Sequence, residues 1–322
     1  MAFFRPMFLR MALAIVLITL GSAQSRAEQD LSIAVTIAPI HSLVAGVLGD
    51  AGTAHLVIKG GGSPHAHALR PSEARALMTA DRVFWVGPNL ETFLADRLNA
   101  ATAAGRLVTL IDTADLVLLP FRDRDLEDDH HDHEDDHHEH DDGHHHEAGG
   151  IDPHLWLDPL NAIVLVEAIR QSLTVAAPAK AATFAANAQA LTTRLQALNN
   201  RMEKALAPVK ARPFLVFHDA YQYLEHRFGL QSVGAITLSP DRAPGAKRIG
   251  QLQDLVHDSA ATCVFTEPQF EPRLAALVVE GTSAKLATLD PLGADIAAGP
   301  QHYETLMRRN LSALTSCLSP QG

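Results

Sequence analysis

Three histidines and one aspartate stand where a chain of alternating strands and helices would gather a ligand. His65 and Asp290 each follow a short apolar segment, His218 ends another, and His154 lies in the sequence Ile-Asp-Pro-His-Leu-Trp-Leu-Asp-Pro. Ligands of open α/β sheets bind beyond the carboxyl ends of the strands. Three imidazoles and one carboxylate suit a tetrahedral zinc ion. We therefore take these four residues as a candidate zinc site.

Each of these residues also has an ordinary structural interpretation. The separations between them, 89, 64 and 72 residues, match no local zinc motif, and an aspartate before proline is a common turn former. His41 and His67 compete as ligands, and an extended His-x-His would place the rings of His65 and His67 on one side. Metal-bound histidines usually donate their second nitrogen to a carboxylate or a carbonyl, for which Glu267 and Asp219 are candidates.

The elements that must position these residues alternate between strand and helix in both halves of the chain. The strands are expected at 31–37, 55–58, 82–86, 107–110, 214–217, 232–236, 263–266 and 286–289. The helices are expected at 40–48, 71–79, 90–104, 158–174, 220–228, 248–259, 273–280 and 302–314. The predicted fold class is α/β, with two lobes that each hold a mostly parallel sheet flanked by helices.

A long alanine-rich segment between Pro178 and Pro208 separates the two halves. Its apolar residues recur at spacings of 3 and 4, which is typical of one face of a helix. A helix of about 28 residues would be about 42 Å long. We predict one long rigid helix at 178–209 that links an N-terminal lobe at 28–177 to a C-terminal lobe at 210–322.

The negative charge of the chain is concentrated in one insert at 122–150. Between Arg122 and Glu147 there are 13 acidic residues, 2 arginines and nine histidines, whereas the rest of the chain is neutral. This composition predicts a flexible loop that binds several metal ions weakly. A His-Glu-x-x-His match at 133–137 lies inside it and follows from composition alone. The absence of a basic run argues against a nucleic-acid partner.

The first 27 residues have the features of an export signal. Arg5 and Arg10 precede the apolar run Met11–Leu20, and we place cleavage after Ala27. The run is about half the ~20 residues that a membrane span needs. The exported protein would be soluble in an oxidising compartment, where its two cysteines, 263 and 317, more often form a disulfide than remain free thiols.

Several segments together resemble one family, the periplasmic zinc-binding proteins of high-affinity zinc ABC importers, known as the ZnuA family. The segments are Ser-Pro-His-Ala-His-Ala-Leu-Arg-Pro-Ser (63–72), Trp-Val-Gly-Pro (85–88), Pro-His-Leu-Trp-Leu-Asp-Pro (153–159), Phe-His-Asp-Ala-Tyr (217–221), Thr-Glu-Pro-Gln-Phe (266–270) and Leu-Asp-Pro-Leu-Gly (289–293). The resemblance covers essentially the whole chain after the signal.

The resemblance implies two lobes joined by a long helix, an acidic histidine-rich loop and the disulfide Cys263–Cys317. It also implies metal ligands at the three histidines named first, with Asp290 as a possible fourth. Manganese-binding relatives typically have a glutamate where this chain has His218, so the third imidazole favours zinc. One departure is Pro64, because some members carry an acidic residue there, before the first ligand.

The function expected from the resemblance is zinc capture in the periplasm and delivery to a membrane permease, without enzymatic activity. A partner ATPase must supply the energy, because the sequence has no phosphate-binding loop of the Gly-x-x-x-x-Gly-Lys-Ser/Thr type. We expect the protein to be a monomer. The alternatives are a periplasmic zinc buffer that uses mainly the insert and, less favoured, a zinc-dependent hydrolase with water at the fourth position.

Overall fold

The computed structural model describes residues 30–122, 150–237 and 244–320. The described residues from Leu31 onward form one compact unit. The predicted export signal at 1–27 and residues 123–149 of the predicted histidine-rich loop lie outside the described residues. In the part of the chain that is described, no helix is both long and apolar enough to cross a membrane.

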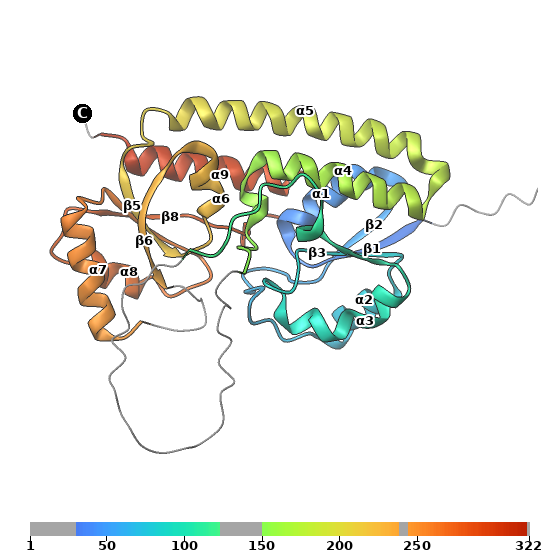
Figure 1. The fold of residues 1–322 in the computed structure, drawn as a ribbon, viewed down its shortest axis with the longest axis horizontal. Coiled ribbons are helices and arrows are strands. Elements are labelled where there is room, and N and C mark those ends of the chain that lie inside the picture. Colours follow the sequence, from blue (N-terminus) through green and yellow to red (C-terminus); the bar gives the residue numbers. More distant parts are fainter. Residues whose placement is uncertain (1–29, 123–149, 238–243, 321–322) are drawn as a thin grey trace, which may run out of the picture. The chain divides into compact units, whose positions relative to one another are not determined.

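The N-terminal lobe is built on a parallel sheet of four strands in the order β2-β1-β3-β4. The strands are β1 (Leu31–Val35), β2 (Gly52–Leu56), β3 (Arg82–Trp85) and β4 (Leu107–Thr109). Helices α1 (Ala38–Leu48) and α4 (Pro159–Ala176) lie on one side of this sheet, and α2 (Pro71–Thr79) and α3 (Asn99–Ala103) lie on the other (Figure 1). Because the sheet is covered on both faces, its two inner strands, β1 and β3, are mostly apolar and buried.

The C-terminal lobe repeats this architecture with the strand order β6-β5-β7-β8, again all parallel. The strands are β5 (Pro213–His218), β6 (Gln231–Thr237), β7 (Cys263–Thr266) and β8 (Lys285–Thr288). The helices are α6 (Gln222–Phe228), α7 (Ala246–Asp258), α8 (Arg273–Val279) and α9 (His302–Leu318). Alternate residues of β5 enter two different cores: Phe214 and Val216 join the main core, while Leu215 and Phe217 pack in a smaller one that includes residues of α7 and α8.

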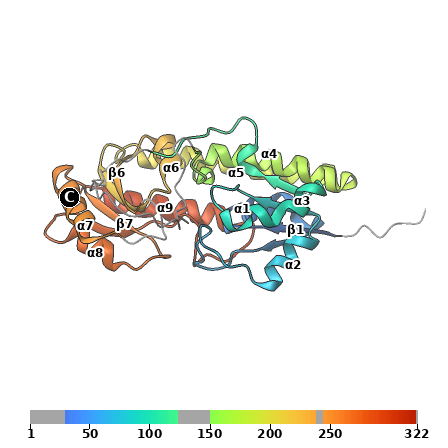
Figure 2. The same ribbon diagram turned by 60° about the horizontal axis from the view of Figure 1, so that its bottom comes forward.

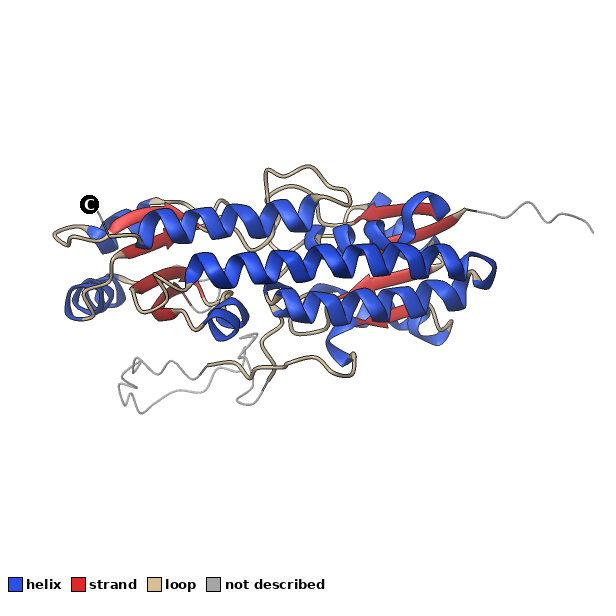
Figure 3. Cartoon of the chain, turned by 90° about the horizontal axis from the view of Figure 1, so that it is seen from above, coloured by secondary structure: helices blue, strands red, loops and turns tan. Residues whose placement is uncertain are grey.

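The two lobes are joined by the long helix α5 (Ala181–Leu206), which follows a short 3₁₀ turn at Pro178–Lys180. Figure 3 shows α5 running beside other long helices. Its predicted apolar face is buried, and it consists of Phe184, Ala188, Leu191, Leu195, Leu198 and Met202. These residues belong to the same core cluster as strand residues of both sheets, so the helix packs on both lobes.

The C-terminal helix α9 also connects the lobes. It contacts α1 of the N-terminal lobe, where the backbone N–H of Tyr303 donates to Ser42 Oγ at 3.0 Å (Figure 2). Its last turn carries Cys317, which forms a disulfide with Cys263 of β7. The predicted pairing of the two cysteines is therefore confirmed.

One predicted helix is wrong in its first half. Residues 90–104 were expected to form a single α-helix, but the structure has a 3₁₀ segment at Thr92–Leu98 before α3. The reason lies at Glu91, whose buried carboxylate accepts hydrogen bonds from the backbone N–H groups of Val86 and Gly87. These bonds turn the chain back on itself after β3 and delay the start of the regular helix.

Candidate metal centre

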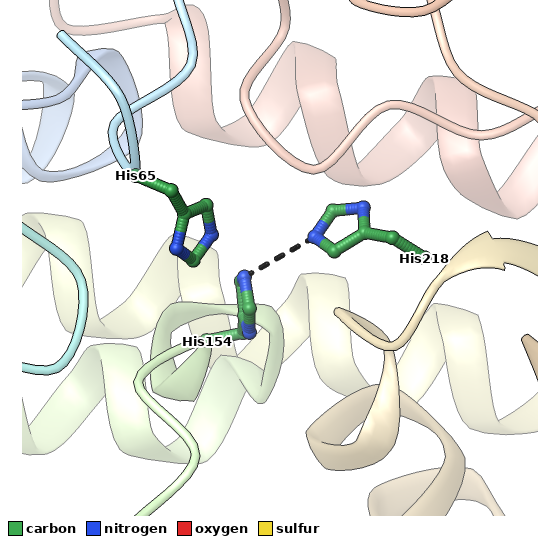
Figure 4. A group of neighbouring side chains, drawn as sticks. All are labelled: His65, His154 and His218. Atoms are coloured by element: carbon green, nitrogen blue, oxygen red, sulfur yellow. Dashed lines mark hydrogen bonds between the residues drawn. The ribbon is translucent and has the colours of Figure 1, made fainter. Parts of the chain in front are cut away.

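The structure brings His65, His154 and His218 together, although they are far apart in the sequence (Figure 4). One ring nitrogen from each lies within 4.8 Å of the others. The Nε2 atoms of His154 and His218 are 3.5 Å apart. Two nitrogen ligands on a tetrahedral zinc ion are separated by about 3.3 Å, given Zn–N bonds of about 2.0–2.1 Å. A small inward movement would therefore place all three nitrogens at bonding distance from one ion.

Each histidine is placed by the end of a regular element. His218 is the last residue of β5, at the carboxyl end of the C-terminal sheet and next to the point where the strand order reverses between β5 and β7. His65 lies on the loop between β2 and α2, and His154 precedes the 3₁₀ turn Leu155–Leu157 that leads into α4. Two candidate ligands thus come from the N-terminal lobe and one from the C-terminal lobe.

Buried carboxylates hold two of the three rings. The Nδ1 atom of His154 is 2.8 Å from Asp152 Oδ1, and the Nδ1 atom of His218 is 2.7 and 2.9 Å from the two oxygens of Glu267. A carboxylate accepts a hydrogen bond from Nδ1–H, which leaves the lone pair on Nε2, the atom that faces the other rings. Both carboxylates are only 2% exposed. This arrangement is the one that metal-binding histidines use.

One of these carboxylates was predicted from the sequence, and the other was not. Glu267 contacts His218 as expected, whereas Asp219 forms an ion pair with Arg122 instead. Asp152 was not considered, although it stands two residues before His154. Its Oδ1 atom also accepts the backbone N–H of His154 at 2.9 Å. An aspartate two residues before a histidine is a local signal for this turn-like bond.

Charge at the site favours a cation. Burial has the largest single effect and lowers the pKa of His218. The charge and hydrogen bond of Glu267, together with the charges of Asp219 and Asp152, outweigh it, so the pKa is raised above its ordinary value. The same field attracts a metal ion to Nε2, in competition with a proton. The pocket at this point has a volume of about 20 Å³, room for one ion or water rather than an organic molecule.

The carboxylate of Asp290 does not join the three histidines in the described structure. Its Oδ1 atom accepts hydrogen bonds from the backbone N–H groups of Leu292 and Gly293 and from Gln269 Nε2, at 2.8 to 3.0 Å. Its Oδ2 atom accepts the N–H of Ala294 at 2.7 Å. Asp290 thus stabilises the loop that follows β8. The turn-former interpretation accounts for its position.

The two competing histidines are also placed outside the cluster. His67 Nε2 lies 3.0 Å from Glu73 Oε2. The same oxygen accepts the backbone N–H of Arg70, directly before α2. His41 lies on α1, and its Nε2 atom is 3.0 Å from the carbonyl oxygen of Ala54 in β2. Both side chains are therefore bound to elements of the N-terminal lobe rather than to the site.

Comparison with known proteins shows the family to which the chain belongs. The family described as zinc-uptake complex component A, periplasmic (ZnuA), matches residues 33–317. The chain belongs to this family. Among its relatives, a high-affinity zinc uptake system protein ZnuA of Brucella suis is 43% identical over 306 residues, which cover 89% of this chain and 91% of the relative. Relatives of the same name from Paracoccus denitrificans and Yersinia pestis are 35% and 31% identical, with 93% and 89% of this chain covered, and 95% and 91% of the relatives.

Solved structures of the family share the fold. A structure described as the crystal structure of ZnuA superposes with a TM-score of 0.74 at 23% identity and covers 90% of this chain and all of that one. The Zn(II)-bound ZnuA-like domain of Streptococcus pneumoniae AdcA has a TM-score of 0.69 at 27% identity, with 91% of this chain and 100% of that domain covered. The predicted two-lobed α/β fold is therefore confirmed.

Proposed function

We propose that this protein captures zinc in the periplasm and delivers it to the membrane permease of an ABC-type zinc importer. The observation that carries the proposal is the convergence of three imidazoles from two lobes on a pocket of ionic size. The family match to a zinc-uptake component and the relatives named as zinc uptake proteins support it. The N-terminal sequence, which has the features of an export signal, supports the location.

The ligands we propose are His65, His154 and His218, each through one ring nitrogen. Three nitrogen donors favour zinc over manganese and magnesium, which prefer oxygen. The Asp290 carboxylate already accepts four hydrogen bonds, so we assign the fourth position to a water molecule rather than to this residue. Because the histidines come from both lobes, separating the lobes at the permease would release the ion.

Two other functions are weaker on the same observations. A zinc hydrolase also keeps a water at the fourth position, but it needs room for an organic substrate next to the metal. The pocket of about 20 Å³ does not provide that room. A zinc buffer that relied on the histidine-rich segment would not require a cluster of three histidines, two of them buried and held by carboxylates. We therefore infer a binding protein rather than an enzyme, and we propose that it acts as a monomer and that its importer supplies the ATPase.

The test is zinc affinity in single-histidine variants, measured by competition with a chelator that reports only the tight site. His65→Ala, His154→Ala and His218→Ala should each weaken binding at least tenfold, about 1.4 kcal/mol. His257→Ala is the matched control, because that ring is exposed and lies beside Asp258, away from the three candidate ligands. Affinity near that of the unaltered protein in two of the three site variants would refute the proposed site.

The transport part of the proposal needs a separate measurement. Cells that lack their own periplasmic zinc-binding protein should grow in zinc-poor medium when they express this chain, and should fail with the His218→Ala variant. Growth that does not depend on the importer's permease would favour the buffer instead.

A further inference from the structure

The two stretches of chain that flank residues 123–149 are bonded to each other. The backbone N–H of Phe121 donates to the carbonyl oxygen of Gly150 at 2.9 Å. The backbone N–H of Asp152 donates to the carbonyl oxygen of Leu119, also at 2.9 Å. Pro120 and Ile151 form an antiparallel bridge between these two bonds. The stretch that carries Asp152 and then His154 is therefore fixed to residues 119–121. We call this pair of stretches, 119–122 and 150–152, the paired base.

Helix α6 of the C-terminal lobe holds the paired base through neutral hydrogen bonds. Gln222 Nε2 donates to the carbonyl oxygen of Pro120 at 2.8 Å. The hydroxyl of Tyr223 donates to the carbonyl oxygen of Asp152 at 2.8 Å and accepts the N–H of Leu119 at 3.1 Å. Since Asp152 also orients His154, α6 bears directly on one candidate ligand.

Arg122 adds a charged contact that reaches the other side of the site. Its Nη1 atom donates to Glu225 Oε2 and its Nη2 atom to Asp219 Oδ1, both at 2.6 Å, and Nη2 also reaches Glu225 Oε1 at 3.2 Å. Asp219 directly follows His218, and both acidic side chains are largely buried. The guanidinium thus bridges the paired base to the turn that carries the ligand of the C-terminal lobe.

We propose that Arg122 is a positioning residue for the zinc site. By binding Asp219 and Glu225 together, it fixes the distance between His218 and His154, which the ion must bridge. The inference rests on the proposed function, because it assumes that these two histidines are zinc ligands. Arg122 is not itself one of the proposed ligands, and its side-chain partners are Asp219 and Glu225.

Charge and geometry make opposite predictions for the loss of Arg122. A positive charge close to a cation site repels the ion, so removing it should tighten zinc binding if charge alone mattered. If the guanidinium positions His218, removing it should weaken zinc binding. Lysine separates the two effects further, because it keeps the positive charge but lacks the planar fork that binds two carboxylates at once.

The experiment measures the affinity for zinc alone in the full exported chain, by chelator competition, for Arg122→Gln and Arg122→Lys. Arg227→Gln is the matched control, because Arg227 makes a comparable ion pair from α6 to the buried Asp158 without contacting the paired base or Asp219. Cobalt(II), added below one equivalent, gives an absorption spectrum that reports how tetrahedral the tight site is. Thermal unfolding of the metal-free protein measures stability separately.

Both Arg122 variants should bind zinc about tenfold more weakly, at the low end of the 10- to 100-fold typical of residues that orient ligands. Their cobalt spectra should lose intensity, while Arg227→Gln should keep both affinity and spectrum. Unchanged or tighter binding in Arg122→Lys overturns the inference, and so does an equal loss in Arg227→Gln. If Arg122→Gln does not fold, the lysine variant decides alone.

The outcome is separable from a failure of the proposed function. If His218→Ala binds zinc as the unaltered protein does, the site itself is wrong, and both claims fall. If His218→Ala loses zinc while both Arg122 variants retain it, only the role of Arg122 is refuted.

Discussion

Removing Glu267 tests whether the carboxylate behind His218 prepares that ring for zinc. Both carboxylate oxygens contact Nδ1, at 2.7 and 2.9 Å, and the side chain is buried. Glu267→Ala removes the acceptor and the charge, so the ring loses its fixed orientation and the tautomer that presents the Nε2 lone pair. Glu267→Gln keeps an acceptor oxygen and removes only the charge.

The expected losses follow from this difference. Carboxylates that orient metal-binding histidines typically contribute 10- to 100-fold in affinity. We expect about 100-fold weaker zinc binding for Glu267→Ala, about 2.7 kcal/mol, and about tenfold for Glu267→Gln, about 1.4 kcal/mol. The difference between the two losses in affinity matters as much as either loss. If only the charge of Glu267 mattered, both variants would weaken zinc binding equally, because both remove that charge.

The assay is chelator competition at fixed pH and ionic strength. Glu271→Gln is the matched control, because Glu271 lies on the same loop, is exposed, and loses the same charge without contacting a candidate ligand. Metal-free samples are compared by thermal unfolding, so that a folding defect is not read as a binding defect. Affinity for Glu267→Ala within about threefold of the unaltered protein, less than 1 kcal/mol, would refute the reasoning.

Three further predictions concern other parts of the chain. Cys263 and Cys317 should react with a thiol probe only after reduction, and quantitative labelling of the untreated protein would contradict the disulfide. Reduction should lower the free energy of unfolding by at most about 4 kcal/mol, and the reduced protein should still bind zinc. Burial raises the pKa of Glu91 to about 7, so the folded protein binds a proton more tightly than the unfolded chain and loses stability as pH rises from about 4.5 through 7. Glu91→Gln should not show this loss. Its free energy of unfolding, measured with denaturant, should therefore rise by about 2–3 kcal/mol relative to that of the unaltered protein between pH 5 and pH 8. Parallel pH profiles of the two proteins would show that Glu91 does not titrate in this range. Deleting 123–147 should abolish only weak zinc binding and slow zinc capture at low ionic strength in stopped-flow experiments, whereas loss of the tight site would contradict our choice of ligands.

Much of the fold was predictable because it follows from local patterns. Strand Cys263–Thr266 and helix Pro71–Thr79 have the predicted bounds, since apolar runs and a proline at a helix start mark them directly. The face of α5 was predictable from its spacing alone. The 3₁₀ segment before α3 was not, because it depends on a buried carboxylate that bonds backwards to the chain. The domain boundaries at 177 and 209 remain predictions.

The site residues, too, were predictable only in part from the sequence. His218 and Glu267 could be proposed because both stand at the ends of neighbouring parallel strands, where side chains of distant segments meet. Asp290 stands at an equivalent place, and only the hydrogen bonds of its loop show that it faces the backbone instead. Arg122 belonged by composition to the acidic insert, and its partners lie 97 and 103 residues away. No sequence period encodes such a contact.

The most direct test of the central claim is a crystal structure of the zinc-loaded protein with anomalous scattering recorded on both sides of the zinc absorption edge. We predict one strong peak within about 2.0–2.1 Å of a ring nitrogen of each of His65, His154 and His218, with a water at the fourth position and Asp290 still bound to its loop. A peak elsewhere, or one that lacks two of these three histidines, would contradict the account.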